Sequence, residues 1–250
     1  MDFVSKSIEG PVVTLTLNRG KVNAINEALA EELRKSLEAI DSDSSIKSVI
    51  LNGHGGFFSF GLDIPEFLNY SKQDFSRFVG KFADLYTYMF TYPKPVIAAL
   101  NGHTIAGGFM LATACDYRVM VAGKARMSLN EITFGSSLFP GSAEMLRYLV
   151  GDRRAEIIAV TGDMYSAQQA KEIGLVDLIS SEELFTKDCM TVATGFVSKF
   201  GPAYQSIKNL LRSDTAAIMR DKDNRYRSEM IDIWYSEDTW ARLKKIKIRD

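Results

Sequence analysis

Short β-branched runs and longer segments of helical periodicity alternate through the first half of the chain. The runs at 3–7 and 12–17 are separated by a glycine and a proline, which predicts a hairpin. Residues 23–26 precede a segment, 29–40, in which leucine and isoleucine recur at helical spacing, so we expect a capped helix there. The apolar run at 48–52 predicts a third strand.

The pattern repeats in the middle of the chain, where extended segments precede each helix. Residues 73–92 carry aromatic and aliphatic side chains on one side of a predicted long helix, and prolines follow it. The apolar run 95–100 is typical of a buried strand, and 107–114 predicts the next helix. Extended segments follow at 117–122 and 126–129. We interpret this order as a repeated β-β-α unit of an α/β fold, not as a doubly wound sheet.

The last third of the chain is mainly helical. Ser166 caps a predicted helix, and 175–179 adds one short strand. Gly201-Pro202 marks a joint beyond which the pattern predicts helices alone. We therefore expect a core over residues 1–198 and a helical C-terminal region over 199–250.

Composition narrows the classes of function. The chain carries 30 basic and 31 acidic residues, so its net charge of −1 gives no overall field that attracts nucleic acid or an anionic membrane. The two cysteines, Cys115 and Cys189, have neither metal-binding spacing nor the pattern of a disulfide framework. With two histidines, His54 and His103, no histidine-rich metal site is expected. We interpret His103 and Cys115 as packing residues.

Targeting signals are the next constraint. The first residues contain no apolar signal-peptide segment, and no run reaches the ~18–20 apolar residues that span a bilayer. The last residues, 247–250, are not a peroxisomal signal. We therefore expect a cytoplasmic protein without a membrane span, or an organellar one if a targeting segment is missing from this sequence.

Two glycine-containing segments are candidates for stabilising an anion. The first, 57–64, reads either as a loop with buried aromatics or as a turn at Gly61 that points the Leu62 N–H into a cavity. In the second, 101–108, a strand gives way to a helix through paired glycines, and a helix N-terminus offers unpaired N–H donors. The spacing matches neither a P-loop nor a dinucleotide-binding fingerprint.

The carboxyl group of Glu131 lies in a third segment, 128–135, with apolar residues on both sides. Most carboxylates are exposed, so a surface glutamate is the ordinary expectation from composition alone. If Glu131 lines an apolar pocket instead, loss of hydration raises its pKa and makes it a proton carrier near neutral pH. The basic stretch 244–247 is either a solvated helix face or a phosphate-binding group.

Taken in order, these segments resemble the crotonase family, also called the enoyl-CoA hydratase/isomerase superfamily. The resemblance covers nearly the whole chain and consists of several separated motifs. The matching motifs are Val22-Asn23-Ala24-Ile25, Phe58-Ser59-Phe60-Gly61-Leu62-Asp63, 95–102, Ala106-Gly107-Gly108, Cys115-Asp116-Tyr117-Arg118, Thr161-Gly162 and 170–177.

The resemblance implies a crotonase spiral of β-β-α turns with a helical C-terminal region that mediates trimerisation, often with two trimers paired in a hexamer. It implies an acyl-CoA thioester as substrate, no cofactor beyond the coenzyme A of the substrate, and no metal. The Leu62 and Gly107 N–H groups would form an oxyanion hole for the thioester carbonyl. The implied substrate pocket is bordered by Ala24, Phe60, Gly61, Asp63, Ile64, Ala106, Met110 and Phe139.

The number of acidic residues indicates the reaction. Hydratases of this family resemble one another in using two glutamates, the first of them three residues after the oxyanion-hole glycine. Met110 occupies that position here, and Glu131 occupies the later one. The chain therefore looks like a mitochondrial-type Δ3,Δ2-enoyl-CoA isomerase of fatty acid metabolism. The resemblance implies that Glu131 moves a proton from C2 to C4 of a 3-enoyl thioester, giving the 2-trans-enoyl product.

Two alternatives stay open at this point. One is a hydratase, or another crotonase-type enzyme, that recruits a second acid from Glu66 or Asp63, which lie near Leu62 in the sequence. The other is a catalytically silent protein that keeps the fold and binds acyl-CoA. Phe60 and the segment 135–141 depart from the family pattern, and we expect them to shape the acyl pocket.

Overall fold

The chain begins with the expected hairpin and capped helix. The computed structural model describes residues 2–199 and 201–248. Strand β1 (Val4–Glu9) pairs antiparallel with β2 (Val12–Leu17), and helix α1 (Glu27–Ser42) follows. The Asn26 side chain accepts a hydrogen bond from the Leu29 N–H at 3.0 Å, which satisfies one of the free donors of the first helical turn.

Three turns of a spiral follow, and each turn adds one strand to each of two sheets. The first turn contains β3 (Ser48–Gly53), β4 (Phe57–Ser59), α2 (Ile64–Phe67) and α3 (Lys72–Phe90). The second contains β5 (Val96–Leu100), β6 (His103–Ile105) and α4 (Gly107–Ala114). The third contains β7 (Tyr117–Val121), β8 (Met127–Ser128) and the 3-10 helix η1 (Glu131–Phe134). The predicted β-β-α repeat is therefore confirmed.

The larger sheet has the strand order β1-β2-β3-β5-β7-β9 and is parallel except for the β1-β2 hairpin. The smaller sheet has the order β4-β6-β8 and is parallel throughout. Of the two interpretations of 57–64, the loop is wrong at both ends, since 57–59 form β4 and α2 begins at Ile64. The three-residue β4 is held by pairing with β6, a partner distant in sequence.

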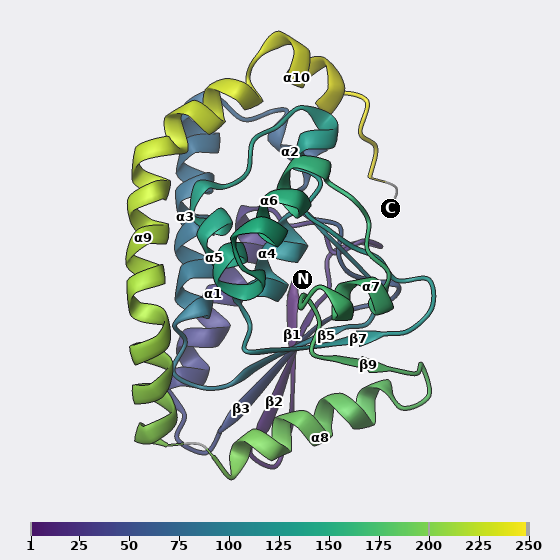
Figure 1. Ribbon diagram of the computed structural model, residues 1–250, viewed down its shortest axis with the longest axis vertical. Coiled ribbons are helices and arrows are strands. Elements are labelled where there is room, and N and C mark those ends of the chain that lie inside the picture. The colour runs from purple at the N-terminus through teal and green to yellow at the C-terminus, as the bar shows by residue number, and fades with distance from the viewer. Residues whose placement is uncertain (1, 200, 249–250) are drawn as a thin grey trace.

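The last third is helical, as predicted, with one short strand. Its elements are α5 (Pro140–Val150), α6 (Asp152–Thr161), α7 (Ala167–Glu172), β9 (Leu178–Ser180), α8 (Phe185–Val197), α9 (Pro202–Trp234) and α10 (Glu237–Leu243). Ser166 caps α7 and forms a capping box with Gln169. Helix α8 packs on the larger sheet, at the lower end of the molecule in Figure 1.

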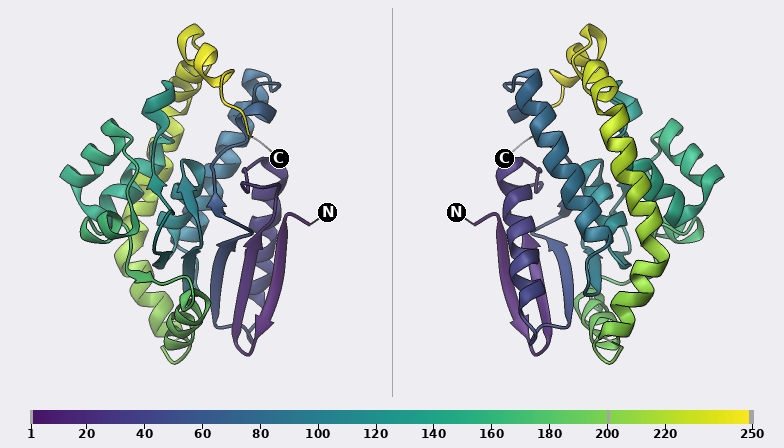
Figure 2. Two further views of the ribbon diagram at one scale, coloured as in Figure 1. Left: turned by 90° about the vertical axis from the view of Figure 1, so that its right-hand side faces the viewer. Right: turned by 90° about the vertical axis from the view of Figure 1, so that its left-hand side faces the viewer.

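Helix α9 runs along one side of the molecule and packs lengthwise against α3 and α5 (Figure 2). The aromatic side chains of Phe75, Phe78 and Phe82 on α3 are fully buried. Burying one phenylalanine side chain contributes about 1.5–3 kcal/mol to stability. Helix α3 therefore provides a packed aromatic layer, and the ring of Trp234 at the end of α9 stacks on it.

A buried charged cluster ties α9 to the larger sheet. Asp116 lies between α4 and β7, and its carboxylate accepts hydrogen bonds from the Val96 N–H and the Lys208 ammonium, both at 2.8 Å. Arg212 of α9 pairs with the same carboxylate at 3.0 Å.

The division into residues 1–198 and 199–250 stays a prediction. No helix within residues 2–199 and 201–248 is long and apolar enough to cross a bilayer.

Candidate active site

A mostly apolar cavity of about 260 Å³ lies where the smaller sheet, α2, η1 and the C-terminal region meet. Six of the predicted site residues line it: Phe60, Leu62, Ile64, Ala106, Glu131 and Phe139. The other lining residues are Ile105, Asn130, Thr133, Phe134, Ser136, Ser137, Trp234 and Ile246. The fold therefore brings together segments that lie far apart in the sequence.

Glu131 is the first residue of η1, directly after the short strand β8 and the buried Leu129. Its side chain is only 4% exposed, and its Oε2 atom has no hydrogen-bond partner among the described residues. Burial raises the pKa of Glu131 to about 8, a shift only partly opposed by a hydrogen bond from its own backbone N–H. The carboxyl group therefore exchanges protons near neutral pH, as a general acid/base requires.

The cavity wall contains one titratable side chain in the described part of the chain, that of Glu131. Asp63 and Glu66, the acids that a second carboxylate role would recruit, do not line it. The Arg19 guanidinium donates to the Asp63 carboxylate at 2.6 Å and to the Glu66 carboxylate at 2.8 Å. Asp63 also caps α2 by accepting from the Glu66 N–H. Both carboxylates are therefore engaged in structural contacts.

The Leu62 N–H points away from the segment at Ile25, with which the residues on either side of Leu62 form hydrogen bonds. The Ile25 N–H donates to the Gly61 carbonyl at 2.7 Å, and the Asp63 N–H donates to the Ile25 carbonyl at 2.9 Å. In such a parallel bridge the amide of the residue between, Leu62, points to the opposite side. The Gly107 N–H belongs to the first residue of α4 and has no acceptor within the helix. In residues 2–199 and 201–248, neither N–H donates to a protein acceptor.

The two amide-bearing segments are in close contact. A β-carbon on Gly61 would lie 2.9 Å from the Ile105 carbonyl oxygen and 3.1 Å from the Gly107 nitrogen, so glycine is required there. Gly61 has a φ of +101° and Ala106 has a φ of 48°, a region that alanine rarely adopts. Strained backbone of this kind persists where the surroundings hold it, and it is concentrated at functional sites.

Hydrogen bonds from Ser59 and Asn23 hold this backbone. The Ser59 hydroxyl donates to the Asn23 carbonyl at 2.8 Å and accepts from the Gly61 N–H at 3.1 Å. The Asn23 side-chain amide donates to the carbonyls of His54 at 3.0 Å and Phe57 at 2.9 Å. These buried bonds fix the turn that leads into Leu62.

The remaining predicted site residues do not line the cavity in the described part of the chain. They are Ala24, Gly61, Asp63, Gly107 and Met110. A β-carbon on Gly107 would lie 3.2 Å from the Leu62 side chain, so the two proposed amide donors are neighbours. The Met110 side chain is fully buried one turn into α4.

The two residues interpreted as packing residues do not line the cavity either. The His103 ring packs on Phe57 with ring centroids 5.1 Å apart, and burial lowers its pKa. The Cys115 thiol is fully buried and donates to the Leu111 carbonyl at 3.3 Å; burial raises its pKa to about 12, which makes it unreactive. Among the described residues there is also no cluster of three or more histidine, cysteine or acidic side chains able to hold a metal ion.

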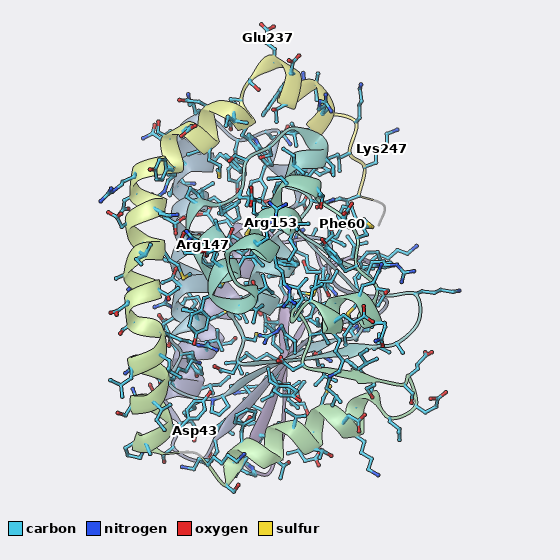
Figure 3. The ribbon with its side chains drawn as sticks, viewed as in Figure 1. Asp43, Phe60, Arg147, Arg153, Glu237 and Lys247 are labelled. Carbon is cyan, nitrogen blue, oxygen red and sulfur yellow. The ribbon has the colours of Figure 1, made fainter. Side chains whose placement is uncertain are left out.

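Eight lining residues were not predicted; six of them lie in the segments 101–108, 128–135 and 135–141, and two, Trp234 and Ile246, lie outside those segments. Both come from the C-terminal region, far along the chain from Glu131, and no local pattern links them to it. A second groove adjoins the cavity at Phe60, and Lys21 and Lys247 are among its lining residues. Phe60 and Lys247 lie on the same side of the molecule in Figure 3. Two lysines beside the entrance of an apolar cavity suit a ligand with a phosphate-bearing end.

Comparison with known proteins identifies the family. The family model described as enoyl-CoA hydratase/isomerase matches residues 7–239. A probable enoyl-CoA hydratase of Bacillus subtilis is 31% identical over 217 residues, which cover 86% of this chain and 83% of that protein. The mitochondrial enoyl-CoA delta isomerase 1 of Mus musculus is 31% identical over 212 residues, which cover 83% of this chain and 73% of that protein.

A solved structure extends the comparison to the fold. The crystal structure of human mitochondrial delta3-delta2-enoyl-CoA isomerase is similar with a TM-score of 0.92, covering 97% of this chain and 95% of that chain at 23% identity. This similarity confirms the expected crotonase fold, with two sheets and a long C-terminal helix. The probable hydratase and the isomerase reported above have the same identity to this chain, 31%. The chain therefore belongs to the enoyl-CoA hydratase/isomerase family.

Proposed function

We propose that the protein shifts the double bond of a 3-enoyl-CoA thioester to give the 2-trans-enoyl-CoA thioester, with Glu131 as its single acid/base. One observation carries this proposal: Glu131 is the one titratable side chain in the described wall of the cavity. A proton shuttle between two carbon atoms of one substrate needs a single group that gives back what it takes. Hydration, in contrast, requires two carboxyl groups that together hold and split a water molecule.

The proposed reaction has two proton transfers. The Glu131 carboxylate removes a proton from C2, and the electron pair of that C–H bond moves into a dienolate whose negative charge lies on the thioester oxygen. The protonated Glu131 then donates to C4 while the C2–C3 double bond forms and the oxyanion returns to a carbonyl. Atoms and charge balance without a further reactant, because the thioester itself makes the C2 proton acidic.

The unpaired N–H groups of Leu62 and Gly107 support the enolate step. Each is a backbone donor with no protein acceptor in the described chain, and a β-carbon on Gly107 would lie 3.2 Å from the side chain of Leu62, which lines the cavity. Donors that are fixed before the reaction stabilise a developing oxyanion without a reorganisation cost, and losing one typically slows a reaction by about 10²–10³-fold.

The pKa of about 8 fits the acid/base role of Glu131. A catalytic group works best when its pKa lies near the operating pH, because it must both accept and release the proton within one turnover. A carboxyl group of ordinary acidity would be a weak base toward a carbon acid. The apolar surroundings of Glu131 thus increase its basicity.

Hydration of a 2-enoyl-CoA is the second candidate, because a probable hydratase is as similar to this chain as the isomerase is, each at 31% identity. It would need a second carboxyl group beside the reacting carbons. Met110 stands at the family's position for that group, and the carboxylates of Asp63 and Glu66 are paired with Arg19 away from the cavity wall. These contacts favour the isomerase.

The groove that contains Lys21 and Lys247 supports a coenzyme A thioester as substrate. In this proposal the acyl chain occupies the cavity and the phosphates lie near the two ammonium groups.

Several apolar side chains of α9, including Ile207, Leu210 and Leu211, are exposed. They support assembly into a trimer or a pair of trimers, which light scattering of the purified protein would test; a monomer would contradict it.

Product analysis tests the proposed reaction directly. Purified protein is mixed separately with 3-hexenoyl-CoA and 2-trans-hexenoyl-CoA. The products are separated by chromatography, which distinguishes the two isomers, and their masses are measured by mass spectrometry, which detects added water. We expect the first compound to convert to the second, and the second to gain no water. A 3-hydroxyacyl-CoA as main product would overturn the proposal.

A pair of matched variants tests the assignment of Glu131. Glu131→Gln keeps the size of the side chain but cannot carry the proton, so we expect turnover to fall by about 10²–10⁴-fold while thioester binding persists. Glu66→Gln changes a carboxylate that pairs with Arg19 outside the cavity wall, and most of the activity should remain. Full activity in Glu131→Gln would show that another group moves the proton.

A further inference from the structure

We propose that Trp234 forms the inner wall of the acyl cavity and limits the substrate to acyl chains of up to about eight carbons. The inference rests on the proposed function in one respect, namely that the acyl chain occupies this cavity. It adds the substrate class and names the residue that sets it.

Trp234 is the last residue of α9 and lines the cavity, although its side chain is only 3% exposed. Its ring stacks on Phe75 of α3, with ring centroids 4.5 Å apart and planes 25° from parallel. One side of the indole therefore contacts the core, so the ring closes the cavity toward the interior of the protein.

The layer behind this wall leaves no space into which it can retreat. Phe75 is fully buried, and Phe67 and Phe78, which contact its ring, are fully buried as well. Phe139, a second aromatic lining residue, packs edge-on against the buried Phe82 at 5.5 Å. Cores of this density resist displacement by even one methylene group. A longer acyl chain would have to displace this aromatic layer.

The end of the cavity at Phe60 is more exposed than the side chain of Trp234. Phe60 is half-buried and also borders the groove with Lys21 and Lys247, so the thioester enters from that end. The acyl chain then runs inward, past Glu131, to the aromatic wall. The distance from entrance to wall is set by the fold, because Trp234 cannot move without breaking its stack on Phe75.

Contacts around the end of α9 hold Trp234 in place. The hydroxyl of its neighbour Tyr235 donates to the Tyr70 carbonyl at 2.9 Å. The Thr239 hydroxyl of α10 donates to the Gly135 carbonyl at 2.7 Å, which ties the C-terminal region to the end of η1. The segment that carries Glu131 and the segment that carries Trp234 are thus fixed relative to each other.

The size of the cavity gives the limit. One water molecule takes up ~30 Å³ in the liquid, and a methylene group roughly as much, so 260 Å³ accommodates about nine such groups. The thioester carbon and its oxygen use part of this space. The volume also lies below the ~300–1,000 Å³ of pockets that take drug-sized ligands. Short acyl chains fit, and a chain of twelve carbons or more does not.

Binding of saturated acyl-CoA thioesters tests the limit independently of turnover. Butanoyl-, hexanoyl-, octanoyl-, dodecanoyl- and hexadecanoyl-CoA are titrated into the full chain by calorimetry. For the unmodified protein we expect affinity to rise up to octanoyl-CoA and to fall at least about tenfold from octanoyl- to dodecanoyl-CoA, since the longer chain cannot be buried. Equal or tighter binding of the two long thioesters would overturn the proposal.

Three variants assign the limit to one side chain. Trp234→Ala opens the wall, so dodecanoyl-CoA binding should recover about tenfold relative to octanoyl-CoA. Trp234→Phe retains a ring on Phe75 and loses no hydrogen bond, because Nε1 has no partner in the described chain; the limit should stay at octanoyl-CoA. Trp240→Ala removes the chain's other tryptophan, which stacks on Tyr235 and does not line the cavity, and should leave the limit unchanged.

The outcomes separate this inference from the proposed reaction. A chain-length limit that moves with Trp234 in a protein that does not isomerise 3-enoyl-CoA would sustain the inference and refute the reaction. Isomerisation without a chain-length limit would do the reverse. An unchanged limit in folded Trp234→Ala contradicts the role of Trp234, and binding of none of the five thioesters contradicts both proposals. If Trp234→Ala does not fold, the profile of the unmodified protein and of Trp234→Phe still decides.

Discussion

The backbone of Gly61 passes so close to Ala106 that a β-carbon on residue 61 would lie 2.9 Å from the Ala106 β-carbon. This contact joins the segment that carries the Leu62 N–H to the helix start that carries the Gly107 N–H. The two proposed oxyanion donors are therefore positioned by one backbone contact, which has no room for any side chain on residue 61.

Gly61→Ala should separate the two donors. The new methyl group would also lie 2.9 Å from the Ile105 carbonyl, so one segment must move. We expect kcat to fall by about 10²–10³-fold, the loss typical of one misplaced oxyanion donor. Steady-state kinetics of the variant, with circular dichroism to establish folding, measures this.

A matched control isolates the steric effect from backbone strain. Gly123 has nearly the same backbone angle as Gly61, with a φ of +103° against +101°, but nothing lies within 4 Å of its would-be β-carbon. Gly123→Ala therefore costs about 1–2 kcal/mol of stability from its unfavourable angle and leaves kcat unchanged. Similar kcat losses in the two variants would remove the contact from the mechanism.

The pH dependence of the reaction follows from Glu131. Proton removal from C2 needs the carboxylate form, and burial raises its pKa to about 8. We therefore expect kcat/KM to increase about tenfold for each pH unit below 8 and to level off above it. A profile measured from pH 5.5 to 9.5 that is flat below pH 8, or that falls with increasing pH, would be incompatible with Glu131 as the base.

The same group should make the fold less stable as pH rises. The pKa of Glu131 in the fold, about 8, lies above its ordinary value of 4.5, so the folded protein holds this proton more tightly than the unfolded chain does. The stability linked to it is fully present below about pH 4.5 and is lost as pH rises through about 8. The difference corresponds to on the order of 5 kcal/mol as an upper bound.

Glu131→Gln tests this linkage, because glutamine stays neutral at every pH. Urea unfolding of the variant and of the unmodified protein at pH 5, 7 and 9 gives the free energy of unfolding of each. We expect the variant to become progressively more stable than the unmodified protein as pH increases. Two stability curves that stay parallel would mean that the buried carboxyl group does not titrate as described.

Much of the fold was readable from local sequence because its signals act locally. The Asn26 cap, the Ser166 capping box and the apolar side of the long helix α3 each depend on residues within a few positions of one another. The β-β-α repeat followed from the order of these elements. It was confirmed by the alternation of strands between the two sheets.

Features that depend on distant partners were not readable. Strand β4 has three residues and exists because β6 pairs with it, so its own sequence reads as a loop. The burial of Glu131 follows from helices that pack over η1, and composition alone would place a glutamate at the surface. Trp234 reaches the cavity because α9 runs back along α3, a path that no motif around residue 234 reports.

A buried contact between α9 and α5 should influence the site from a distance. The Asp223 carboxylate accepts hydrogen bonds from the Tyr86 hydroxyl at 2.9 Å and from the Gly141 N–H at 2.8 Å. Gly141 lies in the first turn of α5, two residues after Phe139, which lines the cavity. Asp223 therefore fixes the start of the helix that follows the Glu131 segment.

Asp223→Ala should cost about 2–5 kcal/mol of unfolding free energy, since it leaves the Tyr86 hydroxyl and the Gly141 N–H buried without acceptors. Because Phe139 loses its anchor, we expect KM to rise more than kcat falls, while the apparent pKa of the kcat/KM profile stays that of Glu131. Asp221→Ala is the control: this exposed carboxylate contacts Arg225 at 2.8 Å and its loss should change stability by less than about 0.5 kcal/mol. Equal effects of the two substitutions in urea unfolding would show that the buried network adds nothing beyond a surface ion pair.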